Sequence, residues 1–269
     1  MGRLDGQFAV VTGGTQGLGA EIARLFAERG AAGLTICGRN GAKGEAVASE
    51  IDKSFGVPVE FVAADLADVD ACRNVIARAK SRFGRIDCLV NAAGLTDRGT
   101  ILDTDPALFD RMMAVNLRAP FFLMQETIKV MRETVTEGSI VNISSVSSYA
   151  GQPFIAAYCA SKGALDTLTR NTAYGLLKNR IRVNALNIGW MASEGEAEVQ
   201  KRFHGASDDW LDTAGSHLPN GRLVDPKEVA RACAYLASAE SGLMTGATIS
   251  FDQSIRGAFD SQPMPDGPL

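Results

Sequence analysis

Short, continuously apolar stretches alternate along the chain with longer stretches of helical periodicity. The first apolar stretch is QFAVVTG, and the segment EIARLFAERG follows it. In that segment Ile22, Leu25 and Phe26 recur at the i, i+3, i+4 spacing of one helix face, and Gly30 predicts where the helix ends. The alternation continues through the apolar stretches LTICGR, VEFVAAD, IDCLVNAAG, SIVNISS, IRVNALNIG and ATISFD.

This alternation predicts the fold class. Continuously apolar strands separated by helices are typical of a parallel sheet covered on both faces, which is a doubly wound α/β fold. We expect a mostly parallel, seven-stranded sheet, with helices around residues 42–54, 71–83, 106–132 and 226–237. The 269 residues hold no internal repeat and no linker, so we expect a single domain over residues 1–269, with one long irregular section at 190–222.

Composition and charge argue against several classes of function. The residues are 46% hydrophobic and 22% charged, as in globular proteins, and the net charge of −4 lacks the basic excess that nucleic-acid binding needs. No apolar stretch approaches the ~20 residues of a membrane-spanning helix, and the N-terminus has no signal-peptide segment. We therefore expect a cytoplasmic protein that binds neither membranes nor nucleic acid.

The metal-ligating residue types are few and scattered. The five cysteines have no CxxC spacing, which fits reduced and mostly buried thiols rather than disulfides or a zinc site. The chain has two histidines, His204 and His217, so we expect no metal centre.

A glycine-rich segment, TGGTQGLG at residues 12–19, lies between the first strand and the first helix. Glycines let the backbone turn sharply and approach a pyrophosphate, while the helix N-terminus supplies N–H donors and positive potential. A simple strand-to-helix turn would also use glycine, and the chain contains 28 of them. The position between strand and helix is nevertheless the context that a dinucleotide-binding loop requires.

A second candidate site lies in YCASKGALDTLTRN, at residues 158–171. Tyr158 and Lys162 are one helical turn apart and therefore lie on the same helix face. A free tyrosine has a pKa of about 10, and a neighbouring ammonium would lower that pKa by favouring the phenolate. Such a phenol can exchange a proton with an alcohol or carbonyl oxygen, although the same spacing in isolation would indicate a surface pair.

These motifs form an ordered set. Gly13, Gly17 and Gly19 give TGxxxGxG, and NAAG at 91–94, the NISS segment at 142–145, YxxxK at 158–162 and NIG at 187–189 follow in order. The set resembles the short-chain dehydrogenase/reductase family over roughly residues 5–252. The resemblance implies a Rossmann-like domain that transfers hydride between a nicotinamide cofactor and a secondary alcohol or carbonyl compound.

The resemblance also implies four catalytic residues. Tyr158 would act as acid and base, Lys162 would lower the phenol pKa and bind the nicotinamide ribose, and Ser145 would hold the reacting oxygen. Ser144 competes with Ser145 but fits less well, because adjacent strand residues point to opposite faces. Asn116, in MMAVNLRAP, resembles the asparagine that completes the family's tetrad by holding a water behind the lysine.

The cofactor preference rests on the end of the second strand, ICGRN. NAD-preferring folds of this kind place an acidic residue there for the ribose 2′-OH, whereas this chain has Gly38, followed by Arg39, which can pair with a 2′-phosphate. We favour NADP, with the alternative that Arg39 is a solvated residue stacking on adenine and that NAD is accepted. The expected cofactor contacts are Gly13, Thr15, Gln16, Gly17, Leu18, Gly19, Arg39, Asp65, Leu66, Asn91, Ala92, Tyr158, Lys162, Ile188 and Ser193.

Four of these expected contacts differ from the family pattern or have a second interpretation. Asp65 and Leu66 resemble the family's adenine-contacting pair, although a lone aspartate after a strand is more often a helix cap. Ile188 stands where the family usually has proline, which frees a backbone N–H. Ser193 stands where the family has threonine and can still hydrogen-bond a carboxamide.

Substrate choice is expected to lie in the 190–222 section, a candidate lid that follows the cofactor site. Trp190, His204 and Trp210 mix aromatic and hydrogen-bonding groups, which suits a sugar or polyol, or equally the outer face of a lid. One alternative is a reductase of 3-oxoacyl thioesters or other ketones. Another is a non-catalytic dinucleotide-binding or scaffold protein, which the presence of the Tyr158, Lys162 and Ser145 set disfavours.

The resemblance further implies a homotetramer or homodimer, built through the helices of Phe121 and Tyr158 and the C-terminal segment. Leu165, Leu168 and Leu176 lie along one side of the Tyr158 helix, where they can serve an interface or the core. The Pro/Gly-rich tail after FDQ is either loose or reaches a neighbouring subunit.

Overall fold

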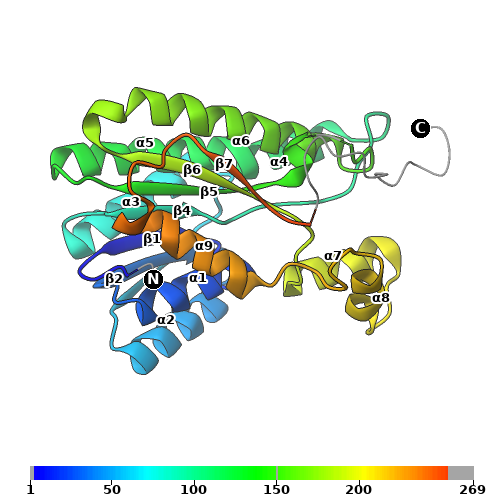
Figure 1. Cartoon of the computed structure of the whole chain (residues 1–269), viewed down its shortest axis with the longest axis horizontal. Helices are drawn as coiled ribbons and strands as arrows, with labels where there is room; N and C mark the ends of the chain where they lie inside the picture. Colours follow the sequence, from blue (N-terminus) through cyan, green and yellow to red (C-terminus); the bar gives the residue numbers. More distant parts are fainter. Residues whose placement is uncertain (1–2, 150, 254–269) are drawn as a thin grey trace.

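The computed structural model describes residues 3–149 and 151–253. Within them, seven parallel strands form one sheet in the order β3-β2-β1-β4-β5-β6-β7 (Figure 1). The chain has the predicted doubly wound α/β fold. The strands are β1 (Phe8–Thr12), β2 (Gly33–Gly38), β3 (Val59–Ala63), β4 (Cys88–Asn91), β5 (Ser139–Ser145), β6 (Arg182–Ile188) and β7 (Thr248–Phe251).

Helices cover both faces of the sheet (Figure 1). One face carries α1 (Gly17–Glu28), α2 (Gly41–Phe55) and α9 (Pro226–Ala237). The other carries α3 (Val69–Phe83), α5 (Ala119–Glu133) and α6 (Ala156–Gly175). The remaining helices are α4 (Pro106–Met113), α7 (Glu194–His204) and α8 (Trp210–Ser216), with a π-helical turn at Ala114–Arg118 and short 3-10 turns at Val146–Tyr149, Leu177–Asn179 and Ala239–Ser241.

The main core has two parts, one on each side of the sheet. Ile22 and Phe26 of α1 are fully buried on one side, as the predicted stripe requires. In β1 the adjacent residues Val10 and Val11 enter opposite parts of the core, which explains why the strands are continuously apolar. Burial of each such side chain contributes ~1.5–3 kcal/mol. Four of the five cysteines are buried and all five are free thiols, as expected.

Local signals set the helix ends. The Asn40 side chain accepts a hydrogen bond from the Lys43 N–H at 3.0 Å and begins α2. Asp105 begins α4 in the same way, through the Leu108 N–H at 2.9 Å, with a proline in the first turn. Gly30 has a φ of +90° just past α1, which confirms it as the predicted stop.

The helices expected at 106–132 are α4 and α5, joined by the π-helical turn that contains Asn116. The structure differs from the sequence-based expectation at the next irregular section. The section at 190–222, expected to be irregular, contains α7 and α8. No residue of α7 is buried, so no apolar stripe could reveal the helix; the Ser193 hydroxyl instead caps it by accepting from the Glu196 N–H at 3.1 Å.

The strand order reverses next to β1, and this positions the candidate site. From β1 the chain runs outward through β2 and β3, then returns to place β4 on the other side of β1. Ligands of open α/β sheets bind in the crevice at the carboxyl ends of strands at such a reversal. The helices α7 and α8 lie beyond the same edge (Figure 1).

Two expectations remain, one on the C-terminal tail and one on membrane-spanning helices. The tail from residue 254 onward lies outside the described residues. Within the described ranges, no helix combines the length and apolar character needed to cross a bilayer.

Candidate active site and cofactor cradle

The glycine loop brings the ends of β1 and β4 into contact. Gly13 has a φ of +68°, and a Cβ there would lie 3.0 Å from the Ala93 Cα. A Cβ on Gly19 would lie 2.2 Å from the Gly13 carbonyl oxygen, so only glycine permits this turn. The Thr12 hydroxyl accepts hydrogen bonds from the N–H groups of Ala92 and Ala93 at 3.0 and 3.1 Å.

The N-terminus of α1 faces this turn with backbone donors available. Gln16 occupies the cap position but makes no capping hydrogen bond, and its side-chain oxygen accepts from the Lys43 ammonium at 3.1 Å instead. Gly17 has a φ of +51°, and the nearest neighbour of its Cβ position is the Ser193 Cβ at 3.9 Å. A cavity of about 470 Å³ opens here, lined in part by Thr15, Gln16, Gly17, Lys43 and Ser193. Uncapped helix donors beside a lysine fit the pyrophosphate of a dinucleotide.

The remaining expected cofactor contacts differ in accessibility. The side chains of Leu18, Leu66 and Asn91 are buried, and the Asn91 amide donates to the Asn142 side-chain oxygen at 2.8 Å. Ile188 is half-buried and lies opposite Ser145 in the register of β5 and β6.

The end of β2 is shaped by glycine and followed by an exposed arginine. A Cβ on Gly38 would lie 2.6 Å from the Thr15 Cγ2, which shows how closely β2 approaches the glycine loop. Arg39 is exposed and forms no salt bridge with the described residues. Its charge helps to lower the pKa of Asp65, so the two side chains lie near each other.

Asp65 is held by a partner that the sequence did not indicate. Both of its carboxylate oxygens accept from the Arg111 guanidinium at 3.0 Å, and this pair is the main reason that the pKa of Asp65 is lowered. Asp65 also accepts from the Ala67 N–H at 3.0 Å. The alternative that Asp65 caps a helix is wrong, because Asp68 caps α3.

The predicted catalytic residues are buried together. Lys162 Nζ lies 5.6 Å from the centroid of the Tyr158 ring and donates to the Ile143 carbonyl at 2.8 Å. The Ser145 side chain is the hydrogen-bonding neighbour that lowers the pKa of the Tyr158 hydroxyl. The Ser144 hydroxyl instead lies 3.5 Å from the Lys162 carbonyl oxygen. Ser145, and not Ser144, therefore faces the phenol.

Asn116 lies behind this group. Its side-chain oxygen accepts from the Leu95 N–H at 2.9 Å, and its amide donates to the Leu95 carbonyl at 2.8 Å and the Ser161 hydroxyl at 3.2 Å. A Cβ on Gly94 would lie 3.8 Å from Asn116 Oδ1 and 3.9 Å from Lys162 Nζ. The polar ends of Asn116 and Lys162 therefore converge on the loop after β4, and Asn116 fixes that loop.

Burial raises the pKa of the Tyr158 phenol in the protein itself. The pKa of Tyr158 is raised to about 12, chiefly by burial, although the Ser145 hydrogen bond lowers it. The Lys162 ammonium donates to the Ile143 carbonyl, and its lowering of the phenol pKa stays a prediction. Burial also lowers the pKa of Lys162 to about 8, and the nearby charge of Asp166 opposes that decrease.

The residues expected to contact the substrate differ in their solvent exposure. Trp190 donates from Nε1 to the Glu196 carboxylate at 2.8 Å and its ring centroid lies 6.1 Å from that of Trp210. Trp210 is only 7% exposed and packs with other apolar residues of the lid, which favours a packing role. His204 is exposed and accepts from Arg98 Nε at 3.3 Å.

Three charged residues near Tyr158 and Lys162 were missed by sequence analysis: Arg98, Asp166 and Glu196. None belongs to a motif. The position of Arg98 just after the NAAG segment was the one available signal, since loops after strands at the reversal point line the crevice. Among the described residues, no cluster could hold a metal ion.

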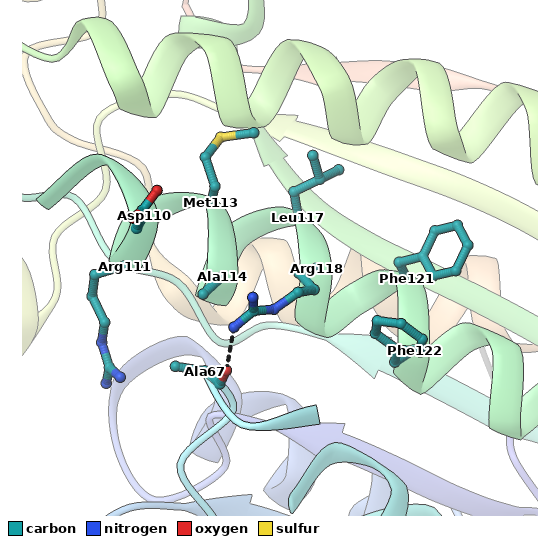
Figure 2. A pocket seen from close by; sticks show the side chains of 9 residues that line it. All are labelled: Ala67, Asp110, Arg111, Met113, Ala114, Leu117, Arg118, Phe121 and Phe122. Atoms are coloured by element: carbon teal, nitrogen blue, oxygen red, sulfur yellow. Dashed lines mark hydrogen bonds between the residues drawn. The ribbon is translucent and has the colours of Figure 1, made fainter. Parts of the chain in front are cut away.

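A larger hollow, of about 790 Å³, lies elsewhere on the surface, where Arg111, Met113, Leu117, Phe121 and Phe122 are among its lining residues. Figure 2 shows the two phenylalanines at one end of it and the Arg118 guanidinium bonded to the Ala67 carbonyl, at 2.6 Å. None of the predicted catalytic residues lines this hollow.

Known proteins resemble the chain over nearly its whole length. A family described as enoyl-(acyl carrier protein) reductase matches residues 13–254. An NADP-dependent (R)-specific alcohol dehydrogenase of Lentilactobacillus kefiri is 32% identical, covering 93% of this chain and 96% of that protein. A galactitol 2-dehydrogenase (L-tagatose-forming) of Cereibacter sphaeroides is 34% identical, covering 93% and 95%. A 3-oxoacyl-(acyl-carrier-protein) reductase of Thermotoga maritima is 32% identical, covering 93% and 98%.

The fold comparison agrees. A mutant of the short-chain dehydrogenase/reductase of Serratia marcescens superimposes with a TM-score of 0.83 at 33% identity, covering 93% of this chain and 98% of that one. A doubly wound domain with a glycine cradle is the architecture of a dinucleotide-dependent oxidoreductase. The chain belongs to the short-chain dehydrogenase/reductase family.

Proposed function

We propose that this protein is an NADP-preferring oxidoreductase that interconverts a secondary alcohol and a carbonyl compound. The burial of the Tyr158 and Ser145 side chains beside Lys162, whose Nζ lies 5.6 Å from the centroid of the Tyr158 ring, is the observation that carries the proposal. A substrate oxygen placed at these two hydroxyls would accept a hydrogen bond from each, which stabilises charge developing on it.

The protonation state of Tyr158 indicates which role each residue has in the proposed reaction. Because burial raises its pKa to about 12, the phenol is protonated at neutral pH and suited to donate its proton to a carbonyl oxygen. Ser145 holds that oxygen in place. The Lys162 ammonium lies on the same helix face, where it can bind the cofactor ribose and support the charge on the phenol oxygen. When bound, the cofactor supplies or accepts the hydride.

Arg39 supports NADP as the preferred cofactor. The guanidinium is exposed and without a salt bridge in the described part of the chain, so it can pair with a 2′-phosphate. The Lentilactobacillus kefiri relative is NADP-dependent. The alternative is that Arg39 stacks on adenine and that NAD serves as well.

A sugar or polyol is the substrate class that we favour. Trp190, Glu196 and His204 place hydrogen-bonding groups on the lid segment, and one relative is a galactitol dehydrogenase. A 3-oxoacyl thioester reductase is the second candidate, supported by the name of the matching family and by the Thermotoga maritima relative. A carrier-bound thioester would need a basic docking surface, but Lys201 of the lid is paired with Asp208 at 2.7 Å.

Two further proposals concern the molecule in the cell. We propose a cytoplasmic location, because five free thiols suit a reducing compartment. We also propose a homodimer or homotetramer, as implied by the family, with the surface around Phe121 as one interface.

The first test compares turnover and cofactor binding. Wild type is assayed with a panel of sugars, polyols and secondary alcohols, with NADP⁺ and NAD⁺ in parallel, and in the reductive direction with the corresponding carbonyl compounds. Tyr158→Phe should lower kcat by ~10²–10⁴-fold, because the substitution removes the proton donor. NADPH affinity, measured by fluorescence titration, should be retained.

Three results would count against parts of the proposal. Turnover that is unchanged in Tyr158→Phe would remove the phenol from the reaction. Cofactor binding without turnover of any compound would favour the non-catalytic alternative. A higher kcat/KM with NAD⁺ than with NADP⁺ would assign Arg39 to adenine stacking.

A further inference from the structure

A cationic side chain lies near the proposed catalytic site. Arg98 belongs to the loop after β4. The neighbouring Gly99 N–H donates to the Phe154 carbonyl at 2.9 Å, and the Ala156 N–H donates to the Gly99 carbonyl at 3.0 Å. Since Ala156 begins α6, these bonds hold Arg98 beside the helical turn that carries Tyr158. The charge of Arg98 accordingly lowers the pKa of Tyr158.

The guanidinium is held in place yet keeps free donors. Nη1 donates to the Thr96 carbonyl at 2.9 Å and Nε donates to His204 Nε2 at 3.3 Å. The group also stacks on two rings, with Cζ 5.5 Å from the centroid of Phe154 and 6.0 Å from that of Phe203. Nη2 has no acceptor, and Arg98 no salt bridge, among residues 3–149 and 151–253. A fixed guanidinium with a free amino group suits a carboxylate or phosphate.

Glu196 supplies the opposite charge near Tyr158. Its Oε1 accepts from Trp190 Nε1 at 2.8 Å and from Gln200 Nε2 at 2.7 Å, and its charge raises the pKa of Tyr158. An anionic group would avoid Glu196 and bind at Arg98, whereas a substrate hydroxyl can donate to Glu196. The surroundings of Tyr158 therefore suit a molecule that carries both an anionic group and hydroxyl groups.

We propose that Arg98 binds an anionic group of the substrate, and that the substrate is a hydroxylated compound ending in a carboxylate or phosphate, such as a sugar acid or sugar phosphate. The inference rests on the proposed function, because it concerns a substrate whose reacting oxygen lies at Tyr158 and Ser145. It narrows the sugar or polyol class to its charged members. In the competing explanation, Arg98 only clamps α7 to the loop after β4.

Matched substrates test this assignment. Galactitol, galactonate and galactitol 1-phosphate are compared by kcat/KM with NADP⁺ in wild type, Arg98→Gln, Arg98→Lys and Arg202→Gln. The last variant is the matched control, because Arg202 stacks on the same Phe203 ring at 4.8 Å and lies outside the proposed site. Wild type should prefer at least one charged compound over galactitol by about 10-fold or more.

The variants distinguish binding of a substrate anion by Arg98 from a purely structural role of Arg98 between α7 and the loop after β4. Arg98→Gln should lower kcat/KM for the charged compound by about 10- to 100-fold, mainly through KM, and should affect galactitol much less. Arg98→Lys should give an intermediate kcat/KM for the charged compound, because lysine keeps the positive charge but lacks the forked N–H donors of the guanidinium. Arg202→Gln should match wild type. The preferred compound identifies carboxylate or phosphate as the group that is bound.

A binding measurement keeps the two proposals distinguishable. NADP⁺-loaded Tyr158→Phe protein is titrated calorimetrically with galactonate and galactitol 1-phosphate, with and without Arg98→Gln. Anion binding that depends on Arg98 supports the subsite even if turnover is absent, which would count against the catalytic role alone. The subsite would be overturned if wild type had the same kcat/KM for the neutral and the charged compounds. It would also be overturned if Arg98→Gln lowered kcat/KM equally for all three compounds.

Discussion

At the scale of single residues, the catalytic helix carries a second buried charge. Asp166 lies one turn beyond Lys162 and is also buried. Its Oδ2 accepts from the Asn187 amide at 2.8 Å, while its Oδ1 has no partner among the described residues. The charge of Asp166 is what opposes the lowering of the Lys162 pKa by burial, to about 8. The charge of Asp166 thus helps to keep Lys162 protonated.

Asp166→Asn should change the pH dependence of turnover. Without the negative charge, the pKa of Lys162 decreases further, so the ammonium is lost at a lower pH than in wild type. We expect the alkaline decline of kcat to move to lower pH by about 1 unit, with turnover at mildly acidic pH retained. The substituted amide can donate to Asn187 Oδ1, which has no partner in the described structure, so folding should survive.

The measurement is a pair of kcat–pH profiles at saturating cofactor. Asp212→Asn, which removes the same charge from an exposed position on α8, should give the wild-type profile. An Asp166→Asn profile that superimposes on wild type would show that the carboxylate does not maintain the Lys162 charge.

At the scale of elements, the start of α1 is a turn that only glycine can make. Gly19 lies in the first turn of the helix, and its missing side chain lets the helix approach the Gly13 carbonyl. Gly41 also lies at the start of a helix, α2, but nothing lies within 4 Å of its Cβ position. The Cβ position is blocked by backbone at Gly19 and open at Gly41.

Gly19→Ala and Gly41→Ala should therefore have opposite effects. A Cβ at Gly19 would lie 2.2 Å from backbone, so the loop must move and NADPH affinity should fall by at least about 10-fold, with a lower Tm. Gly41→Ala should stabilise the protein by about 0.4–1 kcal/mol through the unfolded state, without changing NADPH affinity. Fluorescence titration and thermal unfolding measure both. Equal cofactor affinity in the two variants would contradict a role for the Gly19 approach.

The elements that the sequence could predict are those with local signals. The helix expected around 226–237 is observed at Pro226–Ala237, where Asp225 caps it and a proline begins it, and both are local sequence features. The helices α7 and α8 could not be found in this way, since α7 buries no residue and leaves no apolar period to read.

The same distinction holds within the site. Tyr158, Lys162 and Ser145 lie in motifs, and the structure brings them together. The partners that tune them come from distant segments: Arg98 meets His204 of α7, and Asp65 pairs with Arg111 of α4. The raised pKa of Tyr158 depends on burial in the folded chain, which no sequence motif encodes.

At the scale of the whole molecule, the surface of α4 and α5 carries an exposed apolar patch. Phe121 is 44% exposed and, together with Met113, Leu117 and Phe122, lines the hollow of about 790 Å³ shown in Figure 2. Exposed apolar patches of this kind mark contact surfaces. The charged Arg111 and Arg118 at its border are already bonded to Asp65 and Ala67, so they would not need new partners when the surface is covered.

Phe121→Glu should therefore dissociate the proposed oligomer. A carboxylate in place of the exposed ring would have to be buried without a partner in a symmetric contact, which is unfavourable by several kcal/mol. Light scattering after size exclusion should show a wild-type dimer or tetramer and a smaller Phe121→Glu species, with far-UV circular dichroism unchanged. Phe203→Glu, which adds the same charge at an exposed phenylalanine on the lid, should keep the wild-type mass. A monomeric wild type, or a Phe121→Glu protein of unchanged mass, would show that the α5 surface is not the interface.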